Sequence, residues 1–350
     1  MAKRKALIAG ATGVVGRNLL RHLLDEGGWE IVALSRRKPD IDGRYLHVAV
    51  DLMDPSSCRT RLAELTDVTH LFHAAYVEKP DLRDWVDSNV AMLRNLVEAM
   101  DRIAPRLEHV HVMHGTKWYG NHLGPFPTPA KEDDPRHMPP NFYYDQWDYL
   151  MERQRSAGWS CSSARPHAVS GLAFGNPMNL PMVIAVYAAI SKELGLPLSH
   201  PGTPENYRAL YQCTDAGLLA RAMVWMSTTP ACANHAFNIT NGDLIRWENT
   251  WPKIADYFGM QLGPQRRINL AKYMADKADV WNRIVAKHGL QAVDYGQVAS
   301  WPYGDFVFEA GFDIISDTGK ARRFGFSDSM ETEQMFFDIW DHLRAERIIP

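Results

Sequence analysis

The segment HGTKWYG, residues 114–120, places a lysine where a buried strand would turn into a loop. The preceding residues EHVHVM have the pattern of a strand, and Lys117 follows them almost at once. In a parallel α/β sheet the carboxyl ends of the strands form the edge at which ligands bind. An ammonium group there can stabilise a phenolate or orient the ribose of a cofactor. A solvated lysine at a strand end is the alternative.

A glycine-rich turn near the N-terminus has the residues needed to bind a dinucleotide. Gly10, Gly13 and Gly16 in GATGVVG follow an apolar strand and open a helix. Glycines in this arrangement allow a tight turn and let backbone N–H groups at the helix N-terminus approach a pyrophosphate. The pattern predicts dinucleotide binding, with a purely structural turn as the alternative.

The residues after the second strand favour NADPH over NADH. Enzymes that prefer NAD usually carry an acidic residue there, whereas this chain has Ser35, Arg36 and Arg37, whose two cations suit a 2′-phosphate. Asp51, at the end of the third strand, can accept a hydrogen bond from the adenine amino group. The alternatives are an ordinary basic loop and, for Asp51, a helix N-cap.

Histidines gather on two neighbouring strands, at His70, His73, His109, His111 and His114. Alternation along the strand puts His109 and His111 on one face and His114 on the other, so the three cannot converge on a metal ion without distortion. We therefore expect no metal site. His114 alone lies in the lysine segment, where a neutral imidazole can donate to a substrate oxygen or tune a tyrosine.

The elements that must position these residues alternate between strand and helix. Five segments have the pattern of strands: KALIAG, EIVALSRR, RYLHVAVDLMD, THLFHAA and EHVHVMHG. Helices are expected between them, after the glycine turn, near 56–64 and over 82–103. The elements expected next are a helix near Tyr144, the strand SCSSARPHAV, helices around 182–194 and 216–226, and a strand and turn in AFNITNGDLI. This order predicts an α/β fold, a Rossmann-type doubly wound parallel sheet with a smaller, mainly helical C-terminal substrate-binding lobe.

The domain organisation follows from the same alternation. We assign residues 1–175 to an NADP-binding Rossmann domain, to whose sheet part of 205–245 returns, and residues 176–350 mainly to the substrate-binding lobe. The last hundred residues are rich in aromatics and lack a repeat, which favours a coupled lobe over an independent module.

Composition points to a small-molecule enzyme. Lys plus Arg number 38 against 41 Asp plus Glu, so the net charge of -3 gives no general attraction for nucleic acid or membranes. The four cysteines stand singly, which is typical of reduced thiols in the cytosol, and no apolar run is long enough to span a membrane. We expect a cytoplasmic protein, and a homodimer is compatible with the chain.

The glycine spacing, HAAY at 73–76 and Asn89 resemble the extended short-chain dehydrogenase/reductase superfamily. Its usual catalytic residues are a Ser or Thr, a Tyr, and a Lys four residues after the Tyr that lowers the pKa of the phenol. This chain departs from that pattern. Trp147 stands four residues after Tyr143, and Gly115 stands where the serine is expected.

One atypical branch places the lysine elsewhere. Six segments resemble those of the progesterone 5β-reductase and iridoid synthase family, NADPH-dependent enone reductases: GTKWYG, LGPF, NFYYDQWDYL, RPHAVSG, PMNL and AFNITNGDLIRW. The resemblance covers essentially the whole chain. In that family the catalytic tyrosine is the first of NFYY and the catalytic lysine lies in GxKxY. These positions are Tyr143 and Lys117 here, with a packed aromatic as the alternative for Tyr143.

The resemblance also implies cofactor contacts. Met113 and His114 replace the family's usual glutamine and threonine, and Pro177 lies in a stretch near the cofactor phosphates, where it lacks a backbone donor. The expected cofactor-binding residues are Gly10, Thr12, Gly13, Val14, Val15, Gly16, Ser35, Arg36, Arg37, Asp51, Leu52, Ala74, Ala75, Tyr76, Met113, Tyr143, Ala168, Val169, Asn176, Pro177 and Met178. The expected substrate-pocket residues are His114, Trp118, Tyr119, Phe126 and Tyr211, and for the last four core packing is an equal alternative.

The leading interpretation is an NADPH-dependent reductase of α,β-unsaturated carbonyl compounds, terpenoid- or steroid-like enones or enals, in which Tyr143 and Lys117 stabilise the enolate oxygen. An NADP-dependent alcohol dehydrogenase or carbonyl reductase, acting on the C=O group of allylic or aromatic alcohols and aldehydes, would use the same residues and stays open. A catalytically silent NADP-binding regulator is a further alternative. A nucleotide-sugar epimerase is disfavoured, because the serine and the lysine four residues after the tyrosine are missing.

Overall fold

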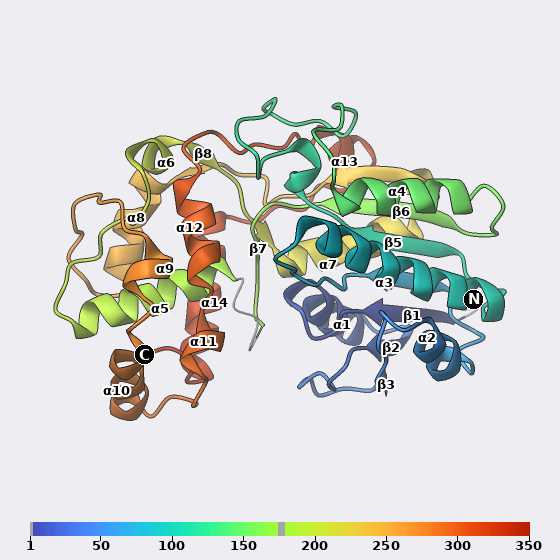
Figure 1. The fold of residues 1–350 in the computed structure, drawn as a ribbon, viewed down its shortest axis with the longest axis horizontal. Coiled ribbons are helices and arrows are strands. Elements are labelled where there is room, and N and C mark those ends of the chain that lie inside the picture. Colours follow the sequence, from blue (N-terminus) through green and yellow to red (C-terminus); the bar gives the residue numbers. More distant parts are fainter. Residues whose placement is uncertain (1–2, 174–178) are drawn as a thin grey trace.

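The computed structural model describes residues 3–173 and 179–350, which form two parts lying side by side (Figure 1). One part, the sheet half, is a parallel sheet with helices on both faces. The other part, the helical lobe, contains most of the chain after residue 179. The sequence prediction of a Rossmann-type α/β fold with a mainly helical C-terminal lobe is confirmed.

The sheet has seven strands in the order β10-β6-β5-β4-β1-β2-β3, and every neighbouring pair is parallel. Such strands are buried on both faces, which explains their continuous apolar runs; Ala6 to Ala9, for example, are fully buried. The strands are β1 (Arg4–Ala9), β2 (Trp29–Leu34), β3 (Leu46–Val48), β4 (His70–His73), β5 (His109–Met113), β6 (Ser160–Arg165) and β10 (His235–Asn238). The order reverses between β1 and β4, the switch point at which such sheets bind ligands.

Helices cover both faces of this sheet. Leucines at Leu19, Leu20 and Leu23 bury one side of α1 (Val14–Glu26) against the sheet, next to α7 (Ala216–Thr228). The opposite face is covered by α2 (Pro55–Leu62), α3 (Leu82–Ile103) and α4 (Phe142–Arg153). Two layers of helices around one sheet give the core its three-layer form.

The helical lobe has its own core, built largely from tryptophans. Trp247, Trp251, Trp281 and Trp340 are almost completely buried there, and the Trp340 indole donates to the carbonyl of Pro181 at 2.9 Å. Its helices are α5 (Leu180–Glu193), α6 (Pro204–Arg208), α8 (Trp247–Tyr257), α9 (Leu270–Tyr273), α10 (Ala278–His288), α11 (Tyr295–Val298), α12 (Trp301–Glu309) and α14 (Thr332–Ala345). Two short strand pairs complete the fold, β7 (Val169–Ser170) with β9 (Thr214–Asp215) and β8 (Leu210–Tyr211) with β11 (Ile245–Arg246). In Figure 1, β7 lies between the two parts.

The chain returns to the sheet half twice after residue 179. The return through α7 and β10 falls within the predicted stretch 205–245. A second return was missed by the sequence analysis: α13 (Gly319–Arg323) packs on β10, and Ala321 and Phe326 join the core beside α7. The predicted domain boundary at residue 175 lies outside the described residues, and the division into a cofactor domain and a substrate lobe stays a prediction.

Candidate active site

The carboxyl ends of β1, β4, β5 and β6 carry most of the predicted site residues. The N–H of Ala74, after β4, donates to the carbonyl of Ala9 at 2.9 Å, and the N–H of Gly10 donates to Leu34 at 3.1 Å. The turns that follow β1, β2 and β4 are therefore held together at the switch point. The helical lobe faces this edge of the sheet (Figure 1).

The glycine turn has the shape of a phosphate cradle. Gly10 has φ +85°, and a Cβ built on it would lie 2.7 Å from the backbone of Ala74 and Ala75. Gly13 is the N-cap residue of α1 and supplies no side-chain cap, so no side-chain cap competes for the N-terminal N–H groups of the helix. These groups fit the pyrophosphate of a dinucleotide.

We expect Gly10→Ala to lower the free energy of unfolding by about 2 kcal/mol or more, because the new methyl group meets the backbone of the neighbouring turn and φ is positive. Gly27→Ala is the matched control. Gly27 also has positive φ, +71°, but nothing lies within 4 Å of its Cβ position. Urea unfolding should show a clearly larger loss for Gly10→Ala, and equal losses would mean that the close approach at Gly10 contributes nothing.

The predicted 2′-phosphate loop follows β2. The Ser35 hydroxyl donates to the carbonyl of Arg37 at 2.6 Å, and the ring of His47 is hydrogen-bonded to the carbonyl of Ser35 at 3.1 Å. The side chains of Arg36 and Arg37 are exposed, and within residues 3–173 and 179–350 neither takes part in an ion pair or side-chain hydrogen bond. Both cations are therefore available to an anion.

An ion pair that the sequence analysis missed ties this loop to α1. The buried guanidinium of Arg17 pairs with the carboxylate of Asp40 and also donates to its backbone carbonyl at 3.3 Å. The hydroxyl of Tyr45 donates to the carbonyl of Pro39 at 2.9 Å. These contacts fix the chain just after Arg37.

Asp51 lies in the turn after β3, and Leu52 beside it is buried. One carboxylate oxygen of Asp51 accepts from the N–H of Met53 at 2.9 Å. The alternative role of Asp51 as a helix N-cap is wrong, because α2 begins one residue after Asp54, whose side chain accepts from the N–H of Ser56. Its contact with adenine stays a prediction.

Tyr143 and Lys117 are brought to the same edge by two different elements. Lys117 lies in a short 3₁₀ turn, Thr116–Tyr119, that follows β5, and Tyr143 lies in the first turn of α4. A Cβ built on Gly115 would lie 3.3 Å from the Tyr143 hydroxyl. The hydroxyl therefore lies over the glycine that replaces the superfamily's serine.

Asn141 joins these two elements, and the sequence analysis missed it. Its side-chain amide donates to the carbonyl of Lys117 at 2.9 Å, and its Oδ1 accepts from the N–H of Tyr143 at 3.1 Å as the N-cap of α4. The hydroxyl of Tyr144 adds a bond to the carbonyl of Trp118 at 2.6 Å. An asparagine directly before a helix is a recognisable cap signal; it would have placed the helix start at Phe142 rather than near Tyr144.

Burial sets the protonation of the pair. It raises the pKa of the Tyr143 phenol well above its usual value, and the carboxylate of Glu78 adds to this effect. It lowers the pKa of the Lys117 ammonium, which Glu78 opposes. At neutral pH the phenol is therefore a neutral hydrogen-bond donor, the form that can stabilise a developing oxyanion.

His114 lies against Tyr143 at the end of β5, with the two ring centroids 4.8 Å apart. Its Nδ1 is hydrogen-bonded to the hydroxyl of Ser163 at 2.8 Å. Burial, with the positive charge of Arg165 adding to it, lowers the pKa of His114 well below its usual value, so the imidazole is neutral. The ring thus lies against the tyrosine, and its predicted roles, donation to a substrate oxygen or tuning of the tyrosine, stay predictions.

The four aromatic residues expected as pocket walls are all buried. Trp118 packs its ring against the guanidinium of Arg165, whose central carbon lies 3.6 Å from the ring centroid, and the Tyr119 hydroxyl donates to Asn238 at 2.6 Å. Phe126 stacks on Tyr119, and Tyr211 lies against His167. These contacts are those of core packing, so a role in the pocket stays a prediction for each.

The backbone after β6 has the unusual geometry expected near a ligand. Ala168 has φ +42°, a rare value for a residue with a Cβ, and Val169 begins β7 directly after it. The ring of His167 is hydrogen-bonded to the hydroxyl of Thr116 at 2.7 Å, which links this segment to the lysine turn. Asn176, Pro177 and Met178 lie outside the described residues.

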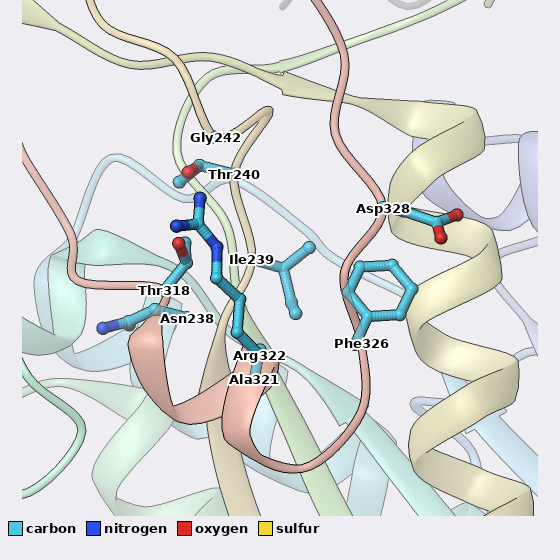
Figure 2. A pocket seen from close by; sticks show the side chains of 9 residues that line it. All are labelled: Asn238, Ile239, Thr240, Gly242, Thr318, Ala321, Arg322, Phe326 and Asp328. Carbon is cyan, nitrogen blue, oxygen red and sulfur yellow. The ribbon is translucent and has the colours of Figure 1, made fainter.

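A hollow elsewhere in the sheet half lies at the end of β10 (Figure 2). The Arg322 guanidinium points toward the hydroxyls of Thr240 and Thr318, and none of the predicted site residues lines the hollow. Its lining residues are Asn238, Ile239, Thr240, Gly242, Thr318, Ala321, Arg322, Phe326 and Asp328. The site predicted at the ends of β1, β4, β5 and β6 does not include this hollow, and its chemistry stays a prediction.

The described residues also bear on two other classes of site. In the part of the chain that the structure describes, no three His, Cys, Asp or Glu side chains are grouped so that they could hold a metal ion. Within the same residues, no helix is both long and apolar enough to cross a membrane.

Comparison with solved structures confirms the fold. UDP-glucose 4-epimerase from Thermotoga maritima, solved with UDP-glucose, superimposes with a TM-score of 0.69 at 16% identity, covering 97% of this chain and 99% of that one. UDP-glucose 4-epimerase from Thermus thermophilus, solved with NAD, gives 0.69 at 17% identity over the same shares. Likeness at this level of identity shows the fold, an extended Rossmann-type fold, and the relatives described next place the chain among the oxidoreductases of the short-chain dehydrogenase/reductase superfamily.

The chain belongs to the family described as the PRISE-like Rossmann-fold domain, whose model matches residues 49–350. It is 32% identical to (S)-8-oxocitronellyl enol synthase from Camptotheca acuminata and 31% identical to 3-oxo-Delta(4,5)-steroid 5-beta-reductase from Arabidopsis thaliana, covering 99% of this chain and 93% of each relative. It is also 32% identical to the short chain dehydrogenase gsfE from Penicillium aethiopicum, over 99% of both chains. The family resemblance read from the sequence is confirmed.

Proposed function

We propose that the protein is an NADPH-dependent reductase of the C=C bond in α,β-unsaturated carbonyl compounds with small hydrophobic skeletons. The observation that carries the proposal is the arrangement of Tyr143 and Lys117. Asn141 ties their backbones together, and the tyrosine hydroxyl lies over Gly115 at the carboxyl edge of the sheet. The relatives named as an enol synthase and a steroid 5β-reductase support this class of substrate.

The residues present fit NADPH. The glycine cradle suits the pyrophosphate, and the exposed Arg36 and Arg37 suit the 2′-phosphate. When bound, the reduced nicotinamide supplies a hydride to the substrate. The backbone at Ala168 and Val169 would hold the nicotinamide amide.

The protein's own residues stabilise the charge that the substrate acquires. Addition of hydride at the β-carbon leaves negative charge on the carbonyl oxygen as an enolate. The neutral phenol of Tyr143 donates a hydrogen bond to that oxygen, and the half-buried Lys117 ammonium adds a positive charge at the same edge of the sheet. The α-carbon then takes a proton from solvent water, which gives the saturated carbonyl product.

We expect the double variant Arg36→Ala/Arg37→Ala to raise the KM for NADPH by about tenfold or more, since each lost pair with the phosphate removes a charge-assisted hydrogen bond. The KM for NADH should change little, because NADH lacks the 2′-phosphate. Arg44→Ala, an exposed arginine further along the same loop, is the control. An equal rise in KM for both cofactors would show that the two arginines do not read the 2′-phosphate.

Product analysis tests the proposed reaction. The protein is incubated with NADPH and a panel that holds a cyclic enone, an acyclic enal and a saturated aldehyde, and the products are separated by gas chromatography and mass spectrometry. A saturated carbonyl product supports the proposal, whereas an allylic alcohol supports the carbonyl-reductase alternative. NADPH binding without any turnover would support the regulator. The homodimer and the cytoplasmic location stay predictions.

A further inference from the structure

Lys117 has an aromatic neighbour that no sequence motif indicated. Its ammonium nitrogen lies 5.1 Å from the centroid of the Trp85 ring, on the face of that ring. Trp85 lies in the first turn of α3 and is 6% exposed. A cation held over an indole face is attracted by the negative charge of the π system, and Trp is the strongest such partner.

The Trp85 ring is itself fixed at its polar edge. Its indole N–H donates to the hydroxyl of Tyr76 at 3.1 Å, and the Tyr76 hydroxyl donates to the carboxylate of Glu78. Tyr76 and Glu78 belong to the segment that follows β4, at the same edge of the sheet. The ring therefore has a set orientation.

The apolar part of the same ring packs against the helix that carries Tyr143. The centroids of Trp85 and Phe142 lie 4.7 Å apart in an edge-to-face arrangement, and those of Phe142 and Tyr143 lie 4.5 Å apart. Trp85, Val86 and Phe142 form a small buried cluster with Tyr143 at its border. One side chain thus contacts the lysine on one side and the tyrosine's helix on the other.

This arrangement answers a geometric problem that the position of the lysine creates. When the lysine lies four residues after the tyrosine, both are on one helix face and the helix fixes their separation. Here Lys117 follows β5 whereas Tyr143 lies on α4, so another contact must fix the ammonium relative to the phenol. Asn141 fixes only the backbones.

We propose that Trp85 is a positioning residue that holds the Lys117 ammonium at a fixed place relative to Tyr143. The inference rests on the proposed function of this pair. Trp85 acts through the lysine, and its indole face is the feature required. The position needs an aromatic ring rather than any large apolar side chain.

Kinetics of Trp85→Leu and Trp85→Phe test this role. Trp85→Leu should lower kcat about tenfold and leave the NADPH dissociation constant within twofold, and Trp85→Phe should recover most of the loss because it keeps a ring face. Trp159→Leu is the matched control. Trp159 is another buried tryptophan in the sheet half, and its indole N–H donates a hydrogen bond to the carboxylate of Asp101 at 2.6 Å. Equal kcat values for the Leu and Phe variants at Trp85 would overturn the proposal.

A double-variant cycle separates positioning from general structural damage. In the Lys117→Met background, Trp85→Leu should cost much less than in the wild type, because there is no ammonium left to hold. A tenfold loss in both backgrounds would show that Trp85 acts on something other than the lysine. The cycle uses whichever substrate of the panel the wild type turns over, so a carbonyl reductase would test Trp85 equally well.

A spectroscopic measurement reads the contact without turnover. In protein labelled with [ε-¹³C]lysine, the Lys117 resonance is identified by its absence from Lys117→Met, and its ε-protons should be shifted upfield by the indole ring. Trp85→Leu should return this resonance to the position of exposed lysines, and Trp159→Leu should leave it unchanged. An unshifted Lys117 resonance in the wild type would contradict the proposal even if no enone were ever reduced.

Discussion

Tyr143→Phe is expected to reduce kcat for enone reduction by about 10²–10³-fold, the usual cost of removing one preorganised donor from a developing oxyanion. The hydroxyl lies over Gly115, and burial raises its pKa, so the phenol is protonated at neutral pH. The substitution removes only this hydroxyl. The ring contacts with His114 and Phe142 would remain.

Tyr149→Phe is the matched control for this variant. Tyr149 lies on the same helix, and its buried hydroxyl has no hydrogen-bond partner within the described residues. Its removal should leave kcat within twofold. Steady-state rates with the enone check both variants. A Tyr143→Phe protein that keeps a third of its kcat would refute the assigned role.

Lys117→Met is expected to lower kcat for enone reduction by about 100-fold, the second large effect. Methionine keeps much of the length of the side chain and removes the charge, so the ring of Trp85 stays covered. Lys131→Met, at an exposed lysine in the loop before α4, should behave as the wild type. Full activity of the Lys117→Met variant would show that the ammonium group takes no part in the reaction.

The activity of the wild type should depend on pH through the ionisation of Lys117. Burial lowers the pKa of Lys117, with Glu78 opposing the shift, and the protonated form is the active one. Activity is therefore complete below this pKa and falls as the pH rises through it, so the alkaline limb should lie below 10.5, the usual value for a lysine. The tyrosine cannot produce this limb because its own pKa is raised. In Lys117→Met the limb should disappear from the profile of kcat/KM for the enone.

Much of the fold was accessible from local pattern. The apolar runs of the parallel strands and the leucine spacing of α1 depend on residues close in sequence, and α3 begins and ends at Leu82 and Ile103, where the sequence placed it. The return of α13 to the sheet was missed, because Gly319–Arg323 is too short to show a helical period. Nothing local marks a segment that packs against a strand more than eighty residues away.

The site residues also differ in whether a local sequence motif marks them. The glycine turn, the arginines after β2 and the Lys117 and Tyr143 motifs could be named from sequence because each is a short segment with a chemical reason of its own. Asn141 carried a cap signal that was not used. Trp85 carried none, since an aromatic residue at the start of an amphipathic helix is ordinary core material until its neighbours are known.

The sequence by itself determined the Rossmann sheet, the glycine turn after β1, the absence of the usual lysine from α4 and the family to which the chain belongs. Only the tertiary structure decided what fixes the replacement lysine. Lys117, Trp85 and Tyr143 lie on three elements, and the 5.1 Å between the ammonium and the indole exists only because β5, α3 and α4 pack at one edge of the sheet. Contacts between residues distant in the chain depend on that packing, and no local spacing encodes them.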